Sequence, residues 1–209
     1  MNSLVTQALT SNEQKKVNRD LRFISLLSQA AKVRHMRVVV GGGYAVDGAL
    51  GEITRAHNDV DLQIYGQRED AMNIVAELIH EVGENDPFFA DLPLMDHGRK
   101  EFFHELYAEK PGFGANIYYL HVVTDPSARD KVIVKNDGSH GEPHAFETHT
   151  VRLNGVAFEA QTAIVELVDK LYKRDRGDPR LLKHDQDIAN LRLVTDADEA
   201  KKRIEQMKK

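Results

Sequence analysis

The sequence contains no cysteine and no long apolar run, and each absence excludes a class of protein. Without cysteine the chain forms no disulfide and offers no thiolate to a metal ion, so nothing indicates an oxidising compartment. No apolar stretch approaches the roughly 20 residues that cross a bilayer. The opening segment, MNSLVTQALTSNEQKK, lacks the basic start and apolar centre of a signal peptide. We therefore expect a cytoplasmic protein with no membrane partner.

A surplus of positive charge is also missing. The formal net charge is −5, which argues against strong non-specific affinity for nucleic acid and suits cationic small molecules. A local basic face is compatible with this total, so a nucleic-acid partner is disfavoured rather than excluded. The 209 residues, of which 41% are hydrophobic and 29% charged, are ordinary for a globular chain and suffice for one domain or two small ones.

Hydrophobic spacing predicts alternating helices and strands in the first third of the chain. The expected elements are a helix from Ser11, a strand over 36–40, a short helix over 43–50, a strand over 59–65 and a helix over 68–83. Ser11 is the candidate N-cap of the first helix, with Gln14 completing a capping box. Gly83 is a natural C′ residue for the last one.

The rest of the chain changes from strands to helices. We expect a loop over 85–100, strands over 101–109 and 115–124, a short strand and mobile turn over 131–144, a hairpin over 146–160, and helices marked by Ile164–Leu171 and Leu181–Leu191. The Asn154-Gly155 pair suits a two-residue type I′ turn in the hairpin. The pattern predicts an α+β fold, with an α/β domain over 1–157 and a helical region over 158–209.

The segment GGGYAVDGALGEITRAHNDVDLQIY, residues 41–65, combines a glycine turn with two carboxylates. Asp59 and Asp61 are two residues apart on a strand, so their side chains point to the same face. Two ionised carboxylates side by side repel each other unless a cation lies between them. A hard ion such as Mg²⁺ takes oxygen ligands of this kind. The pair therefore indicates a metal site.

The glycines at 41–43 indicate the other half of such a site. Because they lack Cβ atoms, a triphosphate can approach their backbone N–H groups closely, and the helix that follows adds partial positive charge at its N-terminus. A glycine cluster alone usually marks a turn, and an Asp-x-Asp alone is usually a solvated strand face. Together, at this spacing, they favour a metal–phosphate site.

This segment resembles the signature of the polymerase-β-type nucleotidyltransferases, and within them the aminoglycoside 2″-adenylyltransferase and lincosamide nucleotidyltransferase group. That group has a Gly-Gly-Trp-Ala-[Ile/Val]-Asp stretch, then Arg-x-His-x-Asp-[Ile/Val]-Asp. The residues here that fit are Gly42, Gly43, Ala45, Val46, Asp47, Leu50, Gly51, Arg55, His57, Asp59, Val60 and Asp61. Tyr44 stands where the group favours tryptophan. The close match covers about 25 residues.

The resemblance implies a polymerase-β-like mixed sheet flanked by helices. It also implies transfer of a nucleoside monophosphate from an NTP to a hydroxylated acceptor, such as an antibiotic, with release of pyrophosphate. Asp59 and Asp61 would be catalytic Mg²⁺ ligands, and Gly42 and Gly43 would hold the β- and γ-phosphates. Base recognition lies outside the motif, so it does not choose among ATP, GTP, CTP and UTP, although an adenylyltransferase resemblance implies ATP.

Two basic residues are further candidates for nucleotide binding. Arg55 has a planar fork that suits phosphate, but an ion pair with Asp47 or Glu52 is an equal alternative. Lys170 lies close to the apolar stripe of its helix and could reach inward to a triphosphate. Its alternative is a solvated helix charge, which is the usual place for lysine.

The acceptor side departs from the resembled pattern. The group carries a third carboxylate on a later strand, and matching that strand places Tyr119 at the position of the carboxylate and His121 two residues on. His121 is the candidate catalytic base, because an ordinary histidine pKa near 6.5 suits proton transfer; it could equally be a core histidine. Glu101 and Glu105 are other candidates.

Three functions stay open. The first is nucleotidyl transfer to a small molecule, and the second is the same chemistry on a tRNA or protein. The third is a nucleotide-binding protein whose transfer activity is reduced or lost, which the missing carboxylate at Tyr119 would explain. The acceptor and the oligomeric state are not encoded in the motif.

Overall fold

The computed structural model describes residues 4–90, 92–99, 103–109, 117–124, 131–136, 140–145, 147–175 and 181–207. Its helices there are α1 (Ser11–Val33), α2 (Gly42–Leu50), α3 (Arg68–Gly83), α4 (Ala163–Asp175), α5 (Leu181–Leu191) and α6 (Ala197–Met207). Its strands are β1 (Arg37–Gly41), β2 (Asp59–Tyr65), β3 (Leu94–Arg99), β4 (Phe103–Glu109), β5 (Ile117–Val123), β6 (Lys131–Asn136), β7 (His140–Ala145), β8 (Thr148–Leu153) and β9 (Val156–Gln161).

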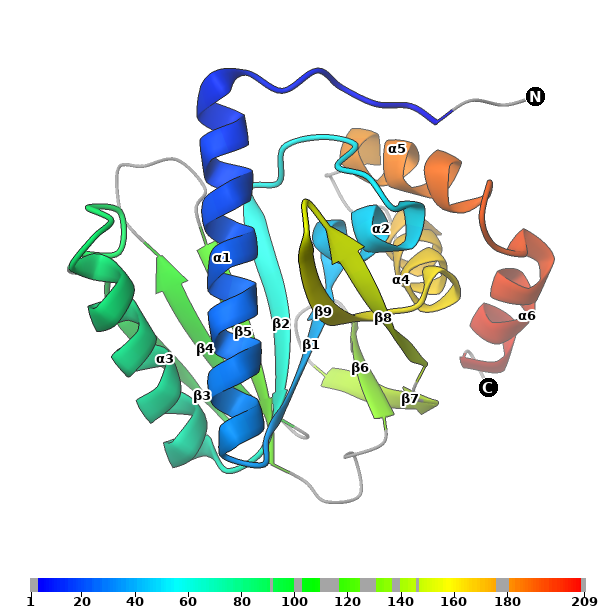
Figure 1. The fold of residues 1–209 in the computed structure, drawn as a ribbon. Coiled ribbons are helices and arrows are strands. Elements are labelled where there is room, and N and C mark those ends of the chain that lie inside the picture. The colour runs from blue at the N-terminus through cyan, green and yellow to red at the C-terminus, as the bar shows by residue number, and fades with distance from the viewer. Residues whose placement is uncertain are drawn as a thin grey trace.

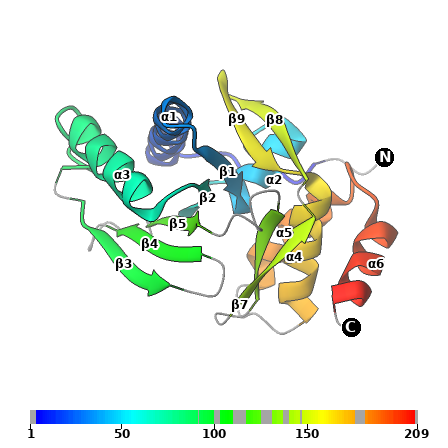
Figure 2. The ribbon, with the colours of Figure 1, turned by 90° about the horizontal axis from the view of Figure 1, so that it is seen from below.

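The described strands form a mixed sheet in the order β3-β4-β5-β2-β1-β9-β8, with β6 and β7 paired separately. Helices α1 and α3 lie side by side over one face of the sheet (Figure 1). Helices α4, α5 and α6 lie together on the side of the molecule away from strand β3 (Figure 2). The expected α+β fold with a mixed sheet, flanking helices and a helical C-terminal part is therefore confirmed. Among the helices described, none is long and apolar enough to cross a membrane.

The main core lies between the sheet and α1 and α3. Its largest fully buried side chains on these elements include Phe23 and Leu27 of α1, Leu62 of β2 and Leu120 of β5. The alternation of β2 sends Val60, Leu62 and Ile64 into this core, so Asp59, Asp61 and Gln63 face the opposite side. The apolar face of the strand thus determines which face of the sheet carries the carboxylates.

Helix α2 joins two cores. Tyr44 and Ala45 belong to the main core, whereas Val46 packs with Leu167 of α4 and Ile188 of α5 in a second one. Because this nine-residue helix packs against both cores, the sheet and the C-terminal helices together fix its position. The division at 157/158 stays a prediction; strand β9 runs across it to Gln161 and pairs with β1.

Several boundary expectations need correction. Thr10, not Ser11, caps α1, and Glu13 rather than Gln14 completes its capping box. Helix α3 does end at Gly83, but that glycine is the last helical residue and Glu84 follows in right-handed geometry. A Cβ at position 83 would lie 3.1–3.2 Å from the backbone of Phe89 and Ala90, so close packing explains this glycine.

The structure contains three elements that the sequence did not predict: strands β3 and β7 and helix α6. Part of the segment expected to be a loop is strand β3, and a strand, β7, follows β6 where a mobile turn was expected. Helix α6 was not anticipated. The hairpin is confirmed: Asn154 and Gly155 both have positive φ angles, 46° and 82°, as a type I′ turn requires.

A buried carboxylate ties α1 to the sheet and to α2. Asp20 is 1% exposed and accepts hydrogen bonds from the hydroxyls of Tyr44 and Tyr118, each at 2.8 Å. Lys16 supplies a cation at 2.5 Å from the same carboxylate. Burial, and then the charge of Asp20, raise the pKa of both tyrosines, which keeps them as donors. This network explains why position 44 carries a phenol where the resembled group favours tryptophan.

Replacing Tyr44 by Phe should lower the free energy of unfolding by about 1–3 kcal/mol, because it removes one donor from a buried carboxylate. Urea unfolding measures the change. Tyr118→Phe should cost a similar amount, and a change below about 0.3 kcal/mol in either variant would contradict the role assigned to Asp20.

Candidate active site

The two aspartates of β2 lie at the start of the strand, beside the first turn of α2. Gly41 of β1 pairs with Asp61 in the antiparallel register, and Asp61 then meets the next residue directly. A Cβ built on Gly42 would lie 2.0 Å from Oδ2 of Asp61, and Gly42 has a φ of +64°. Both facts require glycine at 42, since a side chain would collide with the carboxylate and strain the backbone.

Gly43 makes room for a histidine. A Cβ there would lie 2.1 Å from Nδ1 of His57, whose ring is fully buried and 4.6 Å from the ring of Tyr44. The Nε2–H of His57 donates to Asp47 at 2.6 Å, and Asp47 also accepts from the hydroxyl of Thr54. Burial lowers the pKa of His57 against the opposing effect of Asp47, so the ring is neutral. His57 therefore holds the loop between α2 and β2 in place.

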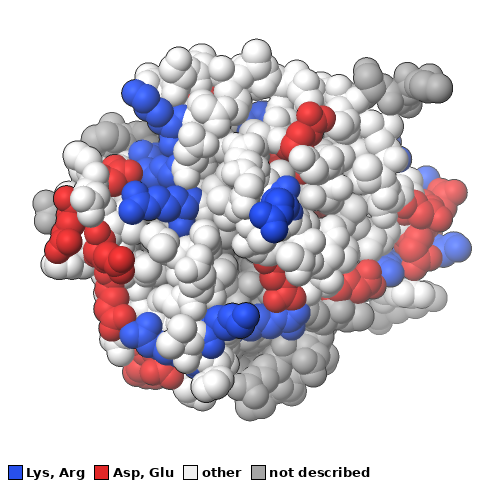
Figure 3. Space-filling model, viewed as in Figure 1, with Lys and Arg blue, Asp and Glu red and all other residues white. Residues whose placement is uncertain are grey.

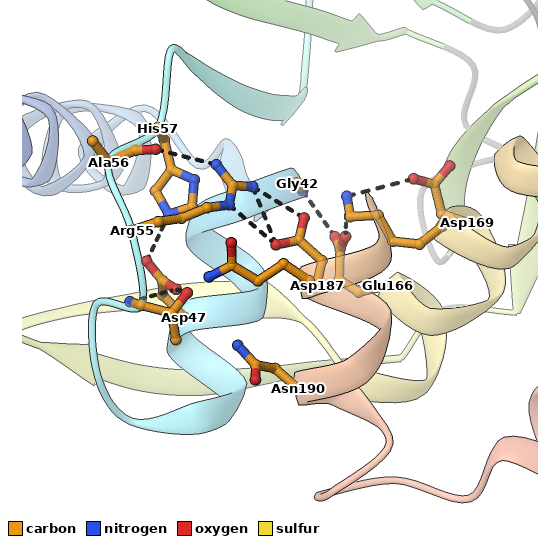
Figure 4. A network of polar contacts seen from close by, with 12 residues as sticks. Gly42, Asp47, Arg55, Ala56, His57, Glu166, Asp169, Asp187 and Asn190 are labelled. Atoms are coloured by element: carbon orange, nitrogen blue, oxygen red, sulfur yellow. Dashed lines mark hydrogen bonds and ion pairs between the residues drawn. The ribbon is translucent and has the colours of Figure 1, made fainter. Parts of the chain in front are cut away.

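Arg55 pairs with a residue of α5. Its Nε and one terminal nitrogen donate to the carboxylate of Asp187 at 3.0–3.2 Å, and its other terminal nitrogen donates to the carbonyl of Ala56 (Figure 4). Both side chains are almost completely buried. The sequence offered Asp47 and Glu52 as partners of Arg55, but its carboxylate partner is Asp187; Asp47 belongs to the network of His57. Whether Arg55 also contacts phosphate stays a prediction.

Lys170 does reach inward from α4. It is 4% exposed, so the alternative of a solvated helix charge is wrong. Its Nζ lies 3.3 Å from Oε2 of Glu166, one turn earlier, and 3.9 Å from Asp169. Burial lowers the pKa of Lys170, but Glu166, Asp169, Asp187 and Asp61 raise it by more, so the amine is a stable cation.

Glu166 is a site residue that the sequence did not reveal. Its side chain is 1% exposed, and its Oε1 accepts the backbone N–H of Gly42 at 2.9 Å (Figure 4). Burial raises its pKa to about 7, and Lys170 opposes that rise. The only sequence signal is a glutamate on the apolar side of α4, four residues before Lys170. Glu166 joins α4 to the glycine turn.

The strand beside β2 carries the expected departure. Tyr119 of β5 is the register partner of Asp61, and His121 is that of Gln63, so no carboxylate of β5 lies beside Asp61. His121 is 6% exposed and its Nε2 lies 3.8 Å from Glu105 of β4. The structure therefore brings together two of the acceptor-side candidates; Glu101 lies outside the described residues.

The two carboxylates at the start of β2 suit a hard cation. Asp59 and Asp61 share a face, and the Cβ-free surface of Gly42 leaves the Asp61 carboxylate against the helix N-terminus. Within the part of the chain that the structure describes, no third His, Asp, Cys or Glu converges on this pair closely enough to complete a three-residue metal site. The residues thus fit an ion whose remaining ligands come from water and substrate, as Mg²⁺ commonly does.

Gly43→Ala should reduce the free energy of unfolding by about 1–3 kcal/mol, because the new methyl group overlaps the buried ring of His57. Gly41→Ala is the matched control: its Cβ would lie 3.3 Å from the side-chain amide of Gln161, which can give way. Chemical denaturation compares the two. Equal effects would show that the contact with His57 is not the reason for glycine at 43.

Asp187→Ala should cost about 3–5 kcal/mol, because it leaves the Arg55 charge buried and unpaired. The control is Glu77→Ala, which breaks the exposed pair with Arg34 and should cost no more than about 1 kcal/mol. Urea unfolding measures both. Removing Arg55 together with Asp187 should restore part of the lost stability. If Asp187→Ala and Glu77→Ala cost the same free energy, the buried pair has no special role.

The signature segment is similar to known proteins of one family. The family model described as aminoglycoside-2''-adenylyltransferase matches residues 24–86. A 2''-aminoglycoside nucleotidyltransferase of Escherichia coli is 38% identical over 57 residues, which are 27% of this chain and 32% of that protein. One from Klebsiella pneumoniae is 35% identical over 63 residues, 29% of this chain and 36% of that protein. The match thus spans about a third of the length of these relatives.

The likeness in fold extends over nearly the whole chain. The solution structure of the antibiotic-resistance factor ANT(2'')-Ia superposes with a TM-score of 0.57 at 16% identity, covering 91% of this chain and 92% of that one. The lincomycin-bound lincosamide antibiotic adenylyltransferase LnuA gives 0.50 at 13% identity, covering 90% and 100%. The resemblance is confirmed: the chain shares the polymerase-β-like fold of these structures, and its residues 24–86 match the aminoglycoside-2''-adenylyltransferase family model.

Proposed function

We propose that this protein transfers a nucleoside monophosphate from an NTP to a hydroxyl group of a small molecule and releases pyrophosphate. The observation that carries the proposal is the position of Asp61, whose carboxylate lies against Gly42 at the N-terminus of α2. Metal-binding and phosphate-binding groups are thereby adjacent. The family signature in residues 24–86 agrees with this chemistry.

Asp59 and Asp61 would hold Mg²⁺, which, when bound, neutralises phosphate charge and orients the reacting phosphoryl group. The backbone N–H groups at Gly42 and Gly43 would receive the β- and γ-phosphates, since donors at a helix N-terminus have no partner within their helix. Lys170 adds a buried cation to the same side. Arg55, beside them, would add positive potential even while it pairs with Asp187.

His121 is proposed to accept the proton of the acceptor hydroxyl. It lies on the same face of the sheet as Asp61, two residues beyond the register partner of Asp61, and Glu105 at 3.8 Å is placed to orient its ring. The rings of Tyr119 and Tyr107 meet edge to face at 4.8 Å beside it. These aromatic surfaces would pack against the carbon framework of an acceptor.

The acceptor class follows from the relatives. ANT(2'')-Ia is described in complex with adenylyl-2''-tobramycin and LnuA with lincomycin, so we propose an antibiotic-like hydroxylated acceptor, ATP as the nucleotide and a cytoplasmic location. A tRNA or protein acceptor is the second candidate. It would call for a broad basic surface, and on the face seen in Figure 3 Lys and Arg lie among Asp and Glu.

Asp59→Asn and Asp61→Asn should each reduce pyrophosphate release by at least about 100-fold, because each removes a charged ligand of the Mg²⁺ ion that would neutralise the phosphate charge. The assay incubates the protein with Mg²⁺, each NTP in turn and a panel of aminoglycosides and lincosamides. Binding of Mn²⁺, followed by electron paramagnetic resonance, should weaken in the same variants.

Asp70→Asn is the control, since Asp70 is an exposed residue of α3, on the opposite face of the sheet (Figure 1). If the wild-type protein binds Mn²⁺ and NTP but transfers to no acceptor, the result favours the hypothesis of a nucleotide-binding protein without transfer activity. Unchanged Mn²⁺ binding in both aspartate variants would refute the metal site itself.

A further inference from the structure

The N–H group of Gly42 already has an anionic partner within the protein. Oε1 of Glu166 accepts it at 2.9 Å, and Oε2 of the same carboxylate lies 3.3 Å from Lys170 (Figure 4). These two partners, one from α2 and one from α4, are the groups assigned above to the phosphates of the nucleotide. The carboxylate of Glu166 thus contacts both the Gly42 N–H and the Lys170 ammonium.

This contact replaces the usual cap of a helix. Gly41, the N-cap residue of α2, has no side chain to accept the first N–H groups of the helix, and such orphan donors attract anions. A glutamate distant by 124 residues in sequence fills that role instead. The carboxylate therefore stands where a phosphate oxygen would otherwise be received.

We propose that Glu166 is an internal competitor for the phosphate position and so sets the affinity of the site for nucleoside triphosphates. An entering triphosphate must take the Gly42 N–H and the Lys170 ammonium from Glu166, whose carboxylate then moves away from the glycine turn. This inference rests on the proposed function. It names a residue outside the signature segment as the determinant of nucleotide affinity.

The charges around Glu166 support displacement. Burial raises the pKa of Glu166 to about 7, the neighbouring Asp169 and Asp61 act in the same direction, and Lys170 and Lys173 oppose them. A carboxylate in such surroundings is held weakly in its charged form. A phosphate group brings more negative charge to the same donors, and like charges side by side at a binding site repel each other. The two anions therefore exclude each other.

A different role for Glu166 gives the opposite prediction. If it were a further metal ligand or a support that holds Lys170 in place for phosphate, its removal would weaken nucleotide binding. In the described part of the chain, Glu166 does not form a three-residue metal group with Asp59 and Asp61, which favours competition. The sign of the change in affinity separates the two roles.

Glu166→Gln is the direct test, because the amide keeps the size of the side chain and removes its charge. Isothermal titration with the Mg²⁺ complex of a non-hydrolysable ATP analogue should give a Kd roughly tenfold lower than for the wild type, the repulsion being removed. Thermal unfolding of both proteins checks that the fold is intact.

Asp169→Asn is the matched control. Asp169 also faces Lys170, at 3.9 Å, and pairs with Lys173 at 2.7 Å, whereas the Gly42 N–H donates to Glu166. Its Kd should change by less than about threefold, since charge near Lys170 alone does not block the glycine turn. If the Kd fell equally in both variants, the inference of competition at Gly42 would be overturned, because the loss of any nearby negative charge would explain the change.

A second measurement uses the wild type and needs no variant. In nuclear magnetic resonance, the backbone amide of Gly42 and the side-chain carboxyl of Glu166 should both shift as the analogue is added, because the bond between them breaks. A Gly42 amide that is unmoved by saturating analogue overturns the inference, as does a Glu166→Gln Kd that is unchanged or higher. If neither wild type nor Glu166→Gln binds any nucleotide, the proposed function fails together with it.

Discussion

The close packing of side chains on two glycines is the constraint on which the site depends. Asp61 lies against the Cα of Gly42 and His57 against that of Gly43, at distances that leave no room for a Cβ. These contacts bring the start of β2 and the loop before it onto the first turn of α2. They explain, without any ligand, why positions 42 and 43 carry glycine. They also place the carboxylates next to a helix N-terminus, where anions are favoured.

The C-terminal helices complete that arrangement and are not a separate layer. Asp187 of α5 neutralises Arg55 beside the signature loop, and α4 brings Glu166 and Lys170 to Gly42. Because Val46 packs into the same helices, α2 is held by apolar contacts on one side and by buried charges at its N-terminus. Lys170, which we propose contacts the phosphates, is thus buried beside its own counter-charge, Glu166.

Local signals in the sequence predicted much of the fold. The strand–helix–strand unit around residues 41–65 and the Asn154-Gly155 hairpin follow from periodicity and turn chemistry, and both are confirmed. The resemblance placed Tyr119 at the position of the third carboxylate, and the structure pairs Tyr119 with Asp61. Contacts between distant segments were not predictable: Glu166 and Asp187 reach the signature loop through the packing of α4 and α5, and spacing along a helix says nothing about which distant backbone group it meets. Strand β3, whose residues alternate poorly, was missed for a related reason, since its pairing with β4 defines it.

In the proposed nucleotide site the glycine turn, the two aspartates and Lys170 act together, and the remaining difference from the resembled group lies at Tyr119. A crystal structure with Mg²⁺ and a non-hydrolysable ATP analogue tests this most directly. It should place the metal between the carboxylates of Asp59 and Asp61, with the triphosphate on the Gly42 N–H and Lys170 and with Glu166 withdrawn. A triphosphate bound elsewhere, or a metal that does not contact the two aspartates, would contradict it.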